Sequence, residues 1–216
     1  MTHRPQPRIS SRKKPQQARS NELVAAILQA ALQVLAKEGA QRFTTTRVAE
    51  RAGVSVGSIY QYFPNKASIL FRLQSDEWRQ TTAMLREMLE DTRHPPLDRV
   101  RRLVHAFVKS ECDEAAMRVA LDDAAPLYRD APEAQEVRKA GADSLAKFMR
   151  EALPGVSKPK RDLASALIKS TLSAVGKAFS ETPRTAREIA TYSNAMADMF
   201  CAYLKQLAGG SGSAGA

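Results

Sequence analysis

The stretch FTTTRVAERAGVSVGSIYQYFPNK, which runs from Phe43 to Lys66, carries the densest structural signals in the chain. Thr45 can cap a first helix that ends at Gly53, because glycine readily takes the left-handed conformation in which a chain leaves a helix. Ser55 can cap a second helix that stops at Pro64, since proline lacks the amide hydrogen that a helix interior needs. Two short helices joined by a three-residue turn with glycine form a helix-turn-helix unit.

The second of these helices presents an outer face suited to DNA. Gly57 and Ser58 are small, so the backbone can come close to a phosphate, which helix N-termini favour. Gln61 can pair with an adenine edge, and Arg47 on the first helix could reach a guanine or a phosphate. Lys66 fits a phosphate contact. The predicted DNA-contacting residues are Thr45, Thr46, Arg47, Val56, Gly57, Ser58, Tyr60, Gln61, Tyr62 and Lys66.

Several of these positions have a second interpretation. Thr45 can be a helix cap, a phosphate ligand or both. Phe63 is interpreted as a core residue, whereas Tyr60 and Tyr62 favour phosphate or sugar contacts, because tyrosine carries a polar tip on an apolar ring. Gln61 is either a base reader or a simple surface residue. Arg47 is interpreted as a DNA contact, because a lone arginine beside a recognition helix has few other partners.

Basic residues are concentrated at the N-terminal end of the chain. The 216 residues carry a net charge of +10, of which residues 1–19 contribute +6 without a single acid. This segment contains three prolines and little apolar content, so it is predicted to be a disordered arm. It indicates a polyanion partner, reached by non-specific phosphate attraction or by insertion into a minor groove. A solubilising tail is the alternative that charge alone leaves open.

Composition excludes a membrane or secreted protein. Apolar residues make up 44% and charged residues 26%, as in ordinary soluble domains. No apolar run approaches the roughly 18 residues of a membrane span, and no apolar stretch follows the basic N-terminus as in a secretory signal. Cys112 and Cys201 are far apart and are interpreted as reduced thiols. The sequence therefore predicts a cytoplasmic protein.

The motifs of common enzyme classes are also missing from the sequence. We find no Ser/His/Asp or Cys/His arrangement, no Gly-rich phosphate loop and no paired carboxylates, and the chain has only three histidines. His105 and Cys112 lack a third ligand, so they indicate core or interface residues rather than a metal site. We therefore expect no enzyme, with no catalytic residue, no metal and no cofactor.

Helical patterns extend over the rest of the chain and predict an all-α protein. A helix from Asn21 to a stop at Gly39 precedes the helix-turn-helix, and Asn65 can cap a long helix that reaches about Asp91. Five further helices follow. The first three are predicted over about 97–108, over 112–125 and from Pro132 to about 153. The fourth has Leu163, Leu167, Thr171, Val175 and Phe179 on one face. The fifth has Pro183 at a first helical position and a Thr185-x-x-Glu188 capping box.

These elements predict a division into four segments. An N-terminal three-helix DNA-binding domain at 20–68 follows the arm at 1–19, and a larger helical domain at 69–208 precedes a flexible tail at 209–216. The apolar positions of the last two helices, about 160–207, cover more than the single stripe of a surface helix. One stripe can face the subunit core and the other a two-fold partner, which predicts a homodimer, with weak packing within one subunit as the alternative.

Methionine and phenylalanine side chains in the predicted domain at 69–208 form the candidate ligand pocket. Such residues at helical spacing are more often simple core, which is the alternative for each of them. The candidate pocket residues are Met84, Met88, Phe107, Met117, Phe148 and Met149.

From about Val24 to Leu70 the sequence resembles the TetR/AcrR (tetracycline-repressor) family of bacterial regulators. The residues that carry the resemblance are Ile27-Leu28-x-Ala30-Ala31, Phe43-Thr44-Thr45, Ala52-Gly53-Val54-Ser55 and Tyr60-x-Tyr62-Phe63-Pro64-Asn65-Lys66. The resemblance implies an all-α homodimer with an N-terminal helix-turn-helix domain and a C-terminal ligand-binding and dimerisation domain. It also implies a repressor that a small-molecule effector releases from an inverted-repeat double-stranded DNA operator. A non-specific architectural DNA-binding protein without ligand response is the alternative.

Overall fold

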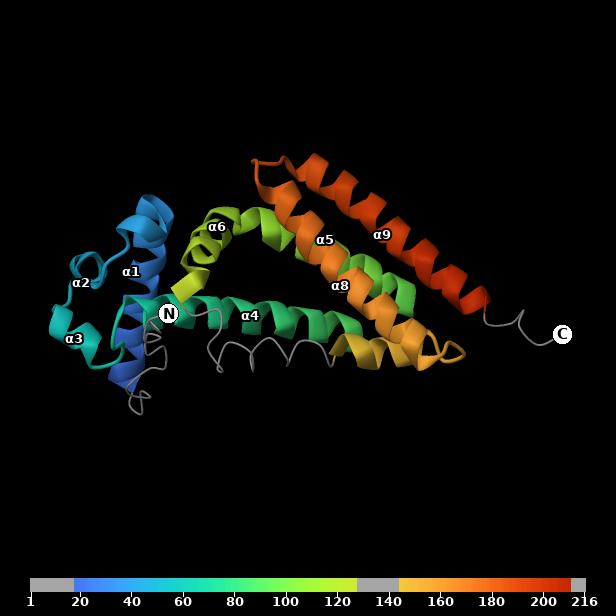
Figure 1. The fold of residues 1–216 in the computed structure, drawn as a ribbon, viewed down its shortest axis with the longest axis horizontal. Coiled ribbons are helices and arrows are strands. Elements are labelled where there is room, and N and C mark those ends of the chain that lie inside the picture. Colours follow the sequence, from blue (N-terminus) through green and yellow to red (C-terminus); the bar gives the residue numbers. More distant parts are fainter. Residues whose placement is uncertain (1–17, 128–143, 211–216) are drawn as a thin grey trace, which may run out of the picture. The chain divides into compact units, whose positions relative to one another are not determined.

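The computed structural model describes residues 18–127 and 144–210, and in these ranges every regular element is a helix (Figure 1). This confirms the all-α prediction. The described helices are α1 (Ala18–Arg42), α2 (Thr45–Ala52), α3 (Val56–Tyr60), α4 (Lys66–Glu90), α5 (Pro96–Asp113), α6 (Ala115–Ala124), a 3₁₀ turn (Ala125–Leu127), residues 144–152, α8 (Lys158–Ser180) and α9 (Ala186–Gly209). Nearly all of the predicted arm, most of the predicted tail and the predicted start at Pro132 lie outside the described residues.

The described chain divides into two compact units. The N-terminal unit contains residues 18–79 and 116–127, and the C-terminal unit contains residues 80–115 and 144–210. Helix α4 therefore contributes residues to both units. Helix α6, which follows α5 in sequence, belongs to the N-terminal unit. The N-terminal unit is thus built from two separate stretches of the chain.

The core of the N-terminal unit draws on every one of its helices. Apolar residues at helical spacing give each helix an inward face, so their burial away from water stabilises the unit. The fully buried members include Ile27, Val48, Ile59, Leu70 and Leu121, from α1, α2, α3, α4 and α6 in that order. By length and composition alone, Ser20–Arg42 of α1 could cross a membrane. Because several of its apolar residues lie in this core, we interpret α1 as a core helix.

Side-chain caps and one glycine define the ends of the short helices. Helix α2 begins after Thr44, whose Oγ1 accepts a hydrogen bond from the Arg47 amide at 3.3 Å. The prediction that Thr45 is the cap was therefore wrong by one residue. Gly53 ends α2 with φ 67°, in the left-handed region that glycine occupies without steric cost. Ser55 caps α3 as predicted, accepting a hydrogen bond from the Ser58 amide at 3.0 Å.

Helix α3 is shorter than the sequence predicted. It ends at Tyr60 rather than Phe63, because the amides of Tyr62 and Phe63 both bond to the Ile59 carbonyl and close the chain into a turn. Asn65 caps α4 as predicted, since its Oδ1 accepts a hydrogen bond from the Ser68 amide at 2.9 Å.

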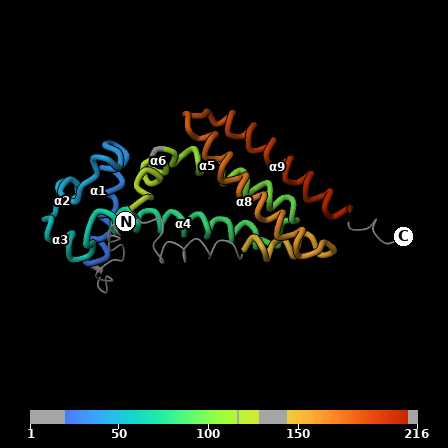
Figure 2. The backbone as a smooth tube through the Cα atoms, viewed as in Figure 1, coloured from blue at the N-terminus to red at the C-terminus, as the bar shows by residue number. Residues whose placement is uncertain are grey.

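In the C-terminal unit, α5 packs against both α8 and α9, and α8 and α9 run antiparallel (Figure 2). A Cβ atom at Gly176 of α8 would lie 3.0 Å from the Phe107 ring of α5. Glycine at that position therefore allows the two helices to approach closely. The predicted capping box at the start of α9 is confirmed by hydrogen bonds between Thr185 and Glu188. Because the helix begins only at Ala186, the prediction of Pro183 as its first helical residue was wrong.

The buried face of α8 differs from the predicted one. The predicted stripe began with Leu163 and Leu167, but these side chains are 63% and 47% exposed. The neighbouring stripe is buried instead: Ala164, Ile168, Leu172, Gly176 and Ser180. Small residues occupy several of its positions because close packing on α5 leaves no room for large ones. Helix α8 therefore has apolar side chains on two faces, of which one is exposed in the single chain.

A buried arginine links three segments of the C-terminal unit. Arg99 of α5 is 1% exposed, and its Nη1 donates to the Leu89 carbonyl near the end of α4 at 2.6 Å. The same nitrogen donates to Glu151 of the helix at 144–152 at 3.1 Å. The guanidinium carbon lies 5.4 Å from the centre of the Phe148 ring. The hydrogen bonds from Arg99 hold the pKa of the Glu151 carboxyl below its ordinary value.

Candidate DNA-binding surface and C-terminal core

The helix-turn-helix presents polar side chains from α2 and α3 at one exposed place. Thr45 is half-buried at the start of α2, and Tyr60 at the end of α3 is 41% exposed. Their hydroxyl oxygens lie 3.4 Å apart. Because the first amides of a helix lack partners within the helix, the start of α2 can donate to an anion beside these two hydroxyls. Thr46, at the same helix start, is also exposed.

The outer face of α3 is small and polar. Gly57 and Gln61 are exposed, whereas Val56 and Ser58 are half-buried. The Ser58 hydroxyl lies 2.8 Å from the Ser55 hydroxyl, so a contact with a base would compete with this local hydrogen bond. Lys66, also exposed, begins α4. The predicted surface therefore combines small residues, an amide and a cation.

Tyr62 occupies a different environment from the other predicted contact residues. It is only 7% exposed, and its hydroxyl lies 2.7 Å from the hydroxyl of Ser20 on α1. The ring belongs to the core of the N-terminal unit. Tyr62 therefore joins α1 to the turn after α3, and its buried ring argues against a DNA contact.

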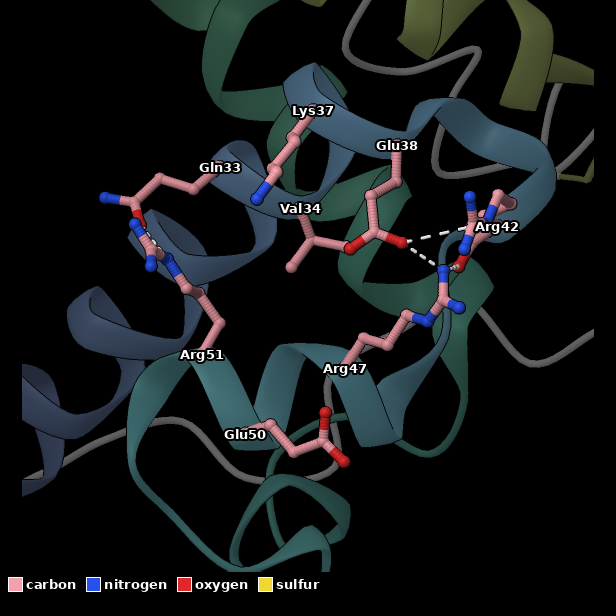
Figure 3. A pocket seen from close by; sticks show the side chains of 8 residues that line it. All are labelled: Gln33, Val34, Lys37, Glu38, Arg42, Arg47, Glu50 and Arg51. Carbon is pink, nitrogen blue, oxygen red and sulfur yellow. Dashed lines mark hydrogen bonds and ion pairs between the residues drawn. The ribbon is translucent and has the colours of Figure 1, made fainter.

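Arg47 has partners that the sequence did not reveal. Its Nη1 forms an ion pair with Glu38 of α1 and donates to the Arg42 carbonyl at 3.2 Å. The premise that this arginine has few other partners was wrong, because α1 and α2 bring residues nine positions apart in sequence into contact. They meet in a cleft of about 650 Å³, and Figure 3 shows the side chains that line it. Its charged residues are Lys37, Arg42, Arg47, Arg51, Glu38 and Glu50.

The predicted pocket residues do not all come together. Phe107, Phe148 and Met149 are buried in the core of the C-terminal unit, and Met84 and Met88 are partly buried against it. Met117 of α6 packs instead against the core of the N-terminal unit. The sequence carried no signal for this separation, because the long-range fold decides which core each helix joins.

Histidine and cysteine residues make ordinary structural contacts. His105 Nε2 lies 2.9 Å from the side-chain oxygen of Asn194, and the Cys201 thiol donates to the Leu97 carbonyl at 3.6 Å. Burial raises the pKa of both Cys112 and Cys201, which makes these thiols less reactive. Within residues 18–127 and 144–210, no three His, Cys, Asp or Glu side chains are grouped as metal ligands would be.

Two models of known protein families match this chain. Residues 27–73 match the model of the bacterial regulatory proteins of the tetR family. Residues 95–207, more than half of the chain, match the model of the tetracyclin repressor-like C-terminal domain. The chain belongs to the TetR family. Both matches agree with the resemblance that the helix-turn-helix sequence showed.

Individual relatives are similar over parts of the chain. The nucleoid occlusion factor SlmA of Vibrio campbellii is 35% identical over 83 residues, which cover 38% of this chain and 42% of the relative. The fatty acid metabolism regulator protein of Bacillus subtilis is 34% identical over 65 residues, which cover 30% of this chain and 34% of the relative. The aligned part of the chain thus spans less than half the length of either relative.

One solved structure matches most of the chain. The transcriptional regulator FadR from Bacillus subtilis, in complex with stearoyl-CoA, has a TM-score of 0.62 and is 17% identical. The match covers 82% of this chain and 97% of the FadR chain. At this identity the likeness concerns the fold alone.

Proposed function

We propose that this TetR-family protein is a cytoplasmic, homodimeric transcriptional repressor without enzymatic activity or a cofactor. It binds an inverted-repeat operator and leaves it when a small molecule binds the C-terminal unit. The observation that carries the proposal is the exposed, polar face of α2 and α3 on a fully packed helix-turn-helix. The proposed DNA contacts are Thr45, Thr46, Arg47, Val56, Gly57, Ser58, Tyr60, Gln61 and Lys66.

The roles of these residues differ between specificity and affinity. Gln61 is proposed to read a base edge, because its exposed amide can donate and accept at adenine. Lys66 is proposed to bind a phosphate, which contributes affinity on any sequence. Tyr60, Thr45 and the first amides of α2 are proposed to hold a second phosphate.

Binding of two DNA pools tests the function and these roles together. Operator DNA is first selected from a random library by the wild-type protein. The affinity of the protein for this operator is then compared with its affinity for unselected DNA. Gln61→Ala should weaken operator binding by about 1–3 kcal/mol and leave unselected DNA nearly unaffected. Lys66→Ala should weaken binding to the operator and to unselected DNA equally. A wild-type protein with steep salt dependence but no preferred sequence would be an architectural DNA-binding protein instead.

The proposed dimer interface is the exposed apolar face of α8 and α9. Leu163 and Leu167 of α8 are exposed in the single chain, and Met199 of α9 is 51% exposed. A two-fold operator requires a two-fold protein, whose recognition helices lie about 34–36 Å apart. Leu167→Asp should therefore shift the protein from dimer to monomer in analytical ultracentrifugation. Val119→Asp is the matched control on α6, since Val119 is 50% exposed and should leave the dimer intact.

The proposed ligand is apolar, because Phe107, Phe148 and Met149 belong to the apolar core of the C-terminal unit. Long-chain acyl compounds are the first class to test, since FadR of Bacillus subtilis has been solved with stearoyl-CoA. Stearoyl-CoA should release operator DNA, whereas CoA alone should not. Release by both would show that the acyl chain is not recognised.

We propose that the ligand acts by favouring an arrangement of α4 and the two DNA-binding units that does not fit the operator. Only a ligand with different affinity for the two arrangements can shift their populations. A disulfide that locks the DNA-binding units of the two subunits at the operator spacing should therefore abolish release of the operator. Full release from the locked dimer would contradict this mechanism.

A further inference from the structure

We propose that Glu38 controls how readily Arg47 binds DNA, because its carboxylate holds the guanidinium on α1 until a DNA phosphate replaces it. The inference rests on the proposed DNA-binding function and adds to it a residue outside the helix-turn-helix. Glu38 acts as a positioning residue, since it contacts Arg47 and not the DNA.

In the cleft, contacts with α1 hold the guanidinium of Arg47 in place. Arg47 lies in the first turn of α2, beside the exposed Thr46 and the free amides proposed to bind phosphate. Its guanidinium contacts Glu38 and the Arg42 carbonyl, both on α1 (Figure 3). The Arg47 and Glu38 side chains are 35% and 24% exposed, so a phosphate can reach the pair from solvent.

A second arginine makes the exchange of partners possible. Arg42 Nε lies 4.0 Å from the same Glu38 oxygen that Arg47 binds. When Arg47 moves to a phosphate, Arg42 can remain beside the carboxylate, so Glu38 does not lose every cation near it. This matters because a partly buried charge without a partner is costly. The cleft thus favours a reversible exchange over a permanent structural pair.

The remaining charges of the cleft provide an internal control. Glu50 of α2 also lines the cleft, is exposed, and forms no ion pair with any residue that the structure describes. Its carboxylate repels phosphates through space but holds no arginine. Replacing either glutamate by glutamine raises the net charge by one, so a difference between the two variants reports the contacts of Glu38 with Arg47 and Arg42, and removing Arg47 isolates its share.

The experiment is a double-mutant cycle on operator affinity. Glu38→Gln should strengthen binding of the selected operator by about three- to fivefold, the range expected for a partly exposed ion pair. Glu50→Gln should strengthen it by less than about twofold. In an Arg47→Met background, which keeps a long apolar side chain without the charge, the advantage of Glu38→Gln over Glu50→Gln should disappear.

Salt dependence and a conservative variant separate this role from a structural one. Arg47→Met should reduce the slope of log affinity against log salt by about one, because one phosphate contact is lost. Glu38→Asp keeps the carboxylate and should bind operator more weakly than Glu38→Gln does. Thermal melts check that each variant folds, and Glu38→Ser takes the place of Glu38→Gln if the latter does not.

The possible results distinguish the inference from the proposed function. A wild-type protein that prefers no DNA sequence contradicts the proposed function itself. If the wild type binds its operator but Glu38→Gln equals Glu50→Gln, or gains as much without Arg47, the restraining role is wrong. Weaker binding by a folded Glu38→Gln would also overturn it, because Glu38 would then orient Arg47 toward DNA.

Discussion

The two units of this regulator are stabilised in different ways. In the N-terminal unit, short helices are fixed at their ends by Thr44, Ser55 and Gly53. In the C-terminal unit, long helices are held by side-by-side packing, and a buried arginine joins three of its segments. The short helices can therefore leave their outer faces polar and available for DNA. The long helices keep apolar side chains on more than one face, which suits the proposed binding of an apolar ligand and a second subunit.

The largest expected effect concerns the core of the N-terminal unit. Phe43 is fully buried between α1 and α2, so Phe43→Ala should lower the free energy of unfolding by about 3–5 kcal/mol. Urea denaturation followed by circular dichroism measures this loss. Tyr60→Ala is the control, because its exposed ring should change stability by less than about 0.5 kcal/mol while weakening DNA binding. Equal stability losses would show that Tyr60 is a core residue.

The turn between α2 and α3 should be the next most sensitive place. Gly53 has φ 67°, so Gly53→Ala should cost about 1–2 kcal/mol of unfolding free energy. At Gly57 a Cβ would meet only Ser55 Oγ at 3.6 Å, an ordinary contact distance. Gly57→Ala should therefore preserve stability and, if α3 faces DNA, reduce operator affinity. A Gly53→Ala protein of wild-type stability would contradict the left-handed conformation.

The consecutive threonines separate capping from DNA contact. Thr44→Ala removes the cap of α2 and should cost about 1 kcal/mol in thermal or urea unfolding. Thr45→Ala should leave stability nearly unchanged but weaken DNA binding, because Thr45 lies beside the Tyr60 hydroxyl. The reverse pattern would restore Thr45 as the cap.

The smallest expected effect tests the ion pair in the C-terminal unit. Arg99 lowers the pKa of Glu151, so this carboxylate stabilises the fold above its unfolded pKa, and the contribution is lost as pH falls through the lower folded pKa. Because Glu151 is 47% exposed, Glu151→Gln should cost only about 1 kcal/mol or less at neutral pH. The difference from wild type should shrink in urea titrations at decreasing acidic pH. A constant difference would assign the loss to packing.

The sequence predicted best where a local signal decides the structure. The Ser55 and Asn65 caps and the capping box of α9 depend on residues three positions apart, and all three were predicted correctly. Three consecutive threonines could not show which one caps α2, because each has the right side chain. In α8 the leucines on one face suggested the core, but the neighbouring face, which includes small residues, is the buried one.

Contacts between distant segments could not be predicted from the pattern. The partner of Arg47 lies on α1, and nothing in the spacing shows how α1 crosses α2. Tyr62 was expected at the surface because of its hydroxyl, but Ser20 provides a hydrogen-bond partner that allows the ring to be buried. Met117 likewise joined the other core, since α6 packs with the N-terminal unit.

The position of α6 limits how such regulators can be recombined. The domain boundary predicted from the sequence suggests that residues 20–68 could be exchanged between relatives as an independent DNA-binding domain. In this chain, however, Leu121 and Ala124 of α6 are part of the core of the N-terminal unit. A chimera joined at residue 68 would therefore pack the α6 of another protein against the DNA-binding core of this chain. Successful grafts should therefore transfer α6 together with the DNA-binding helices.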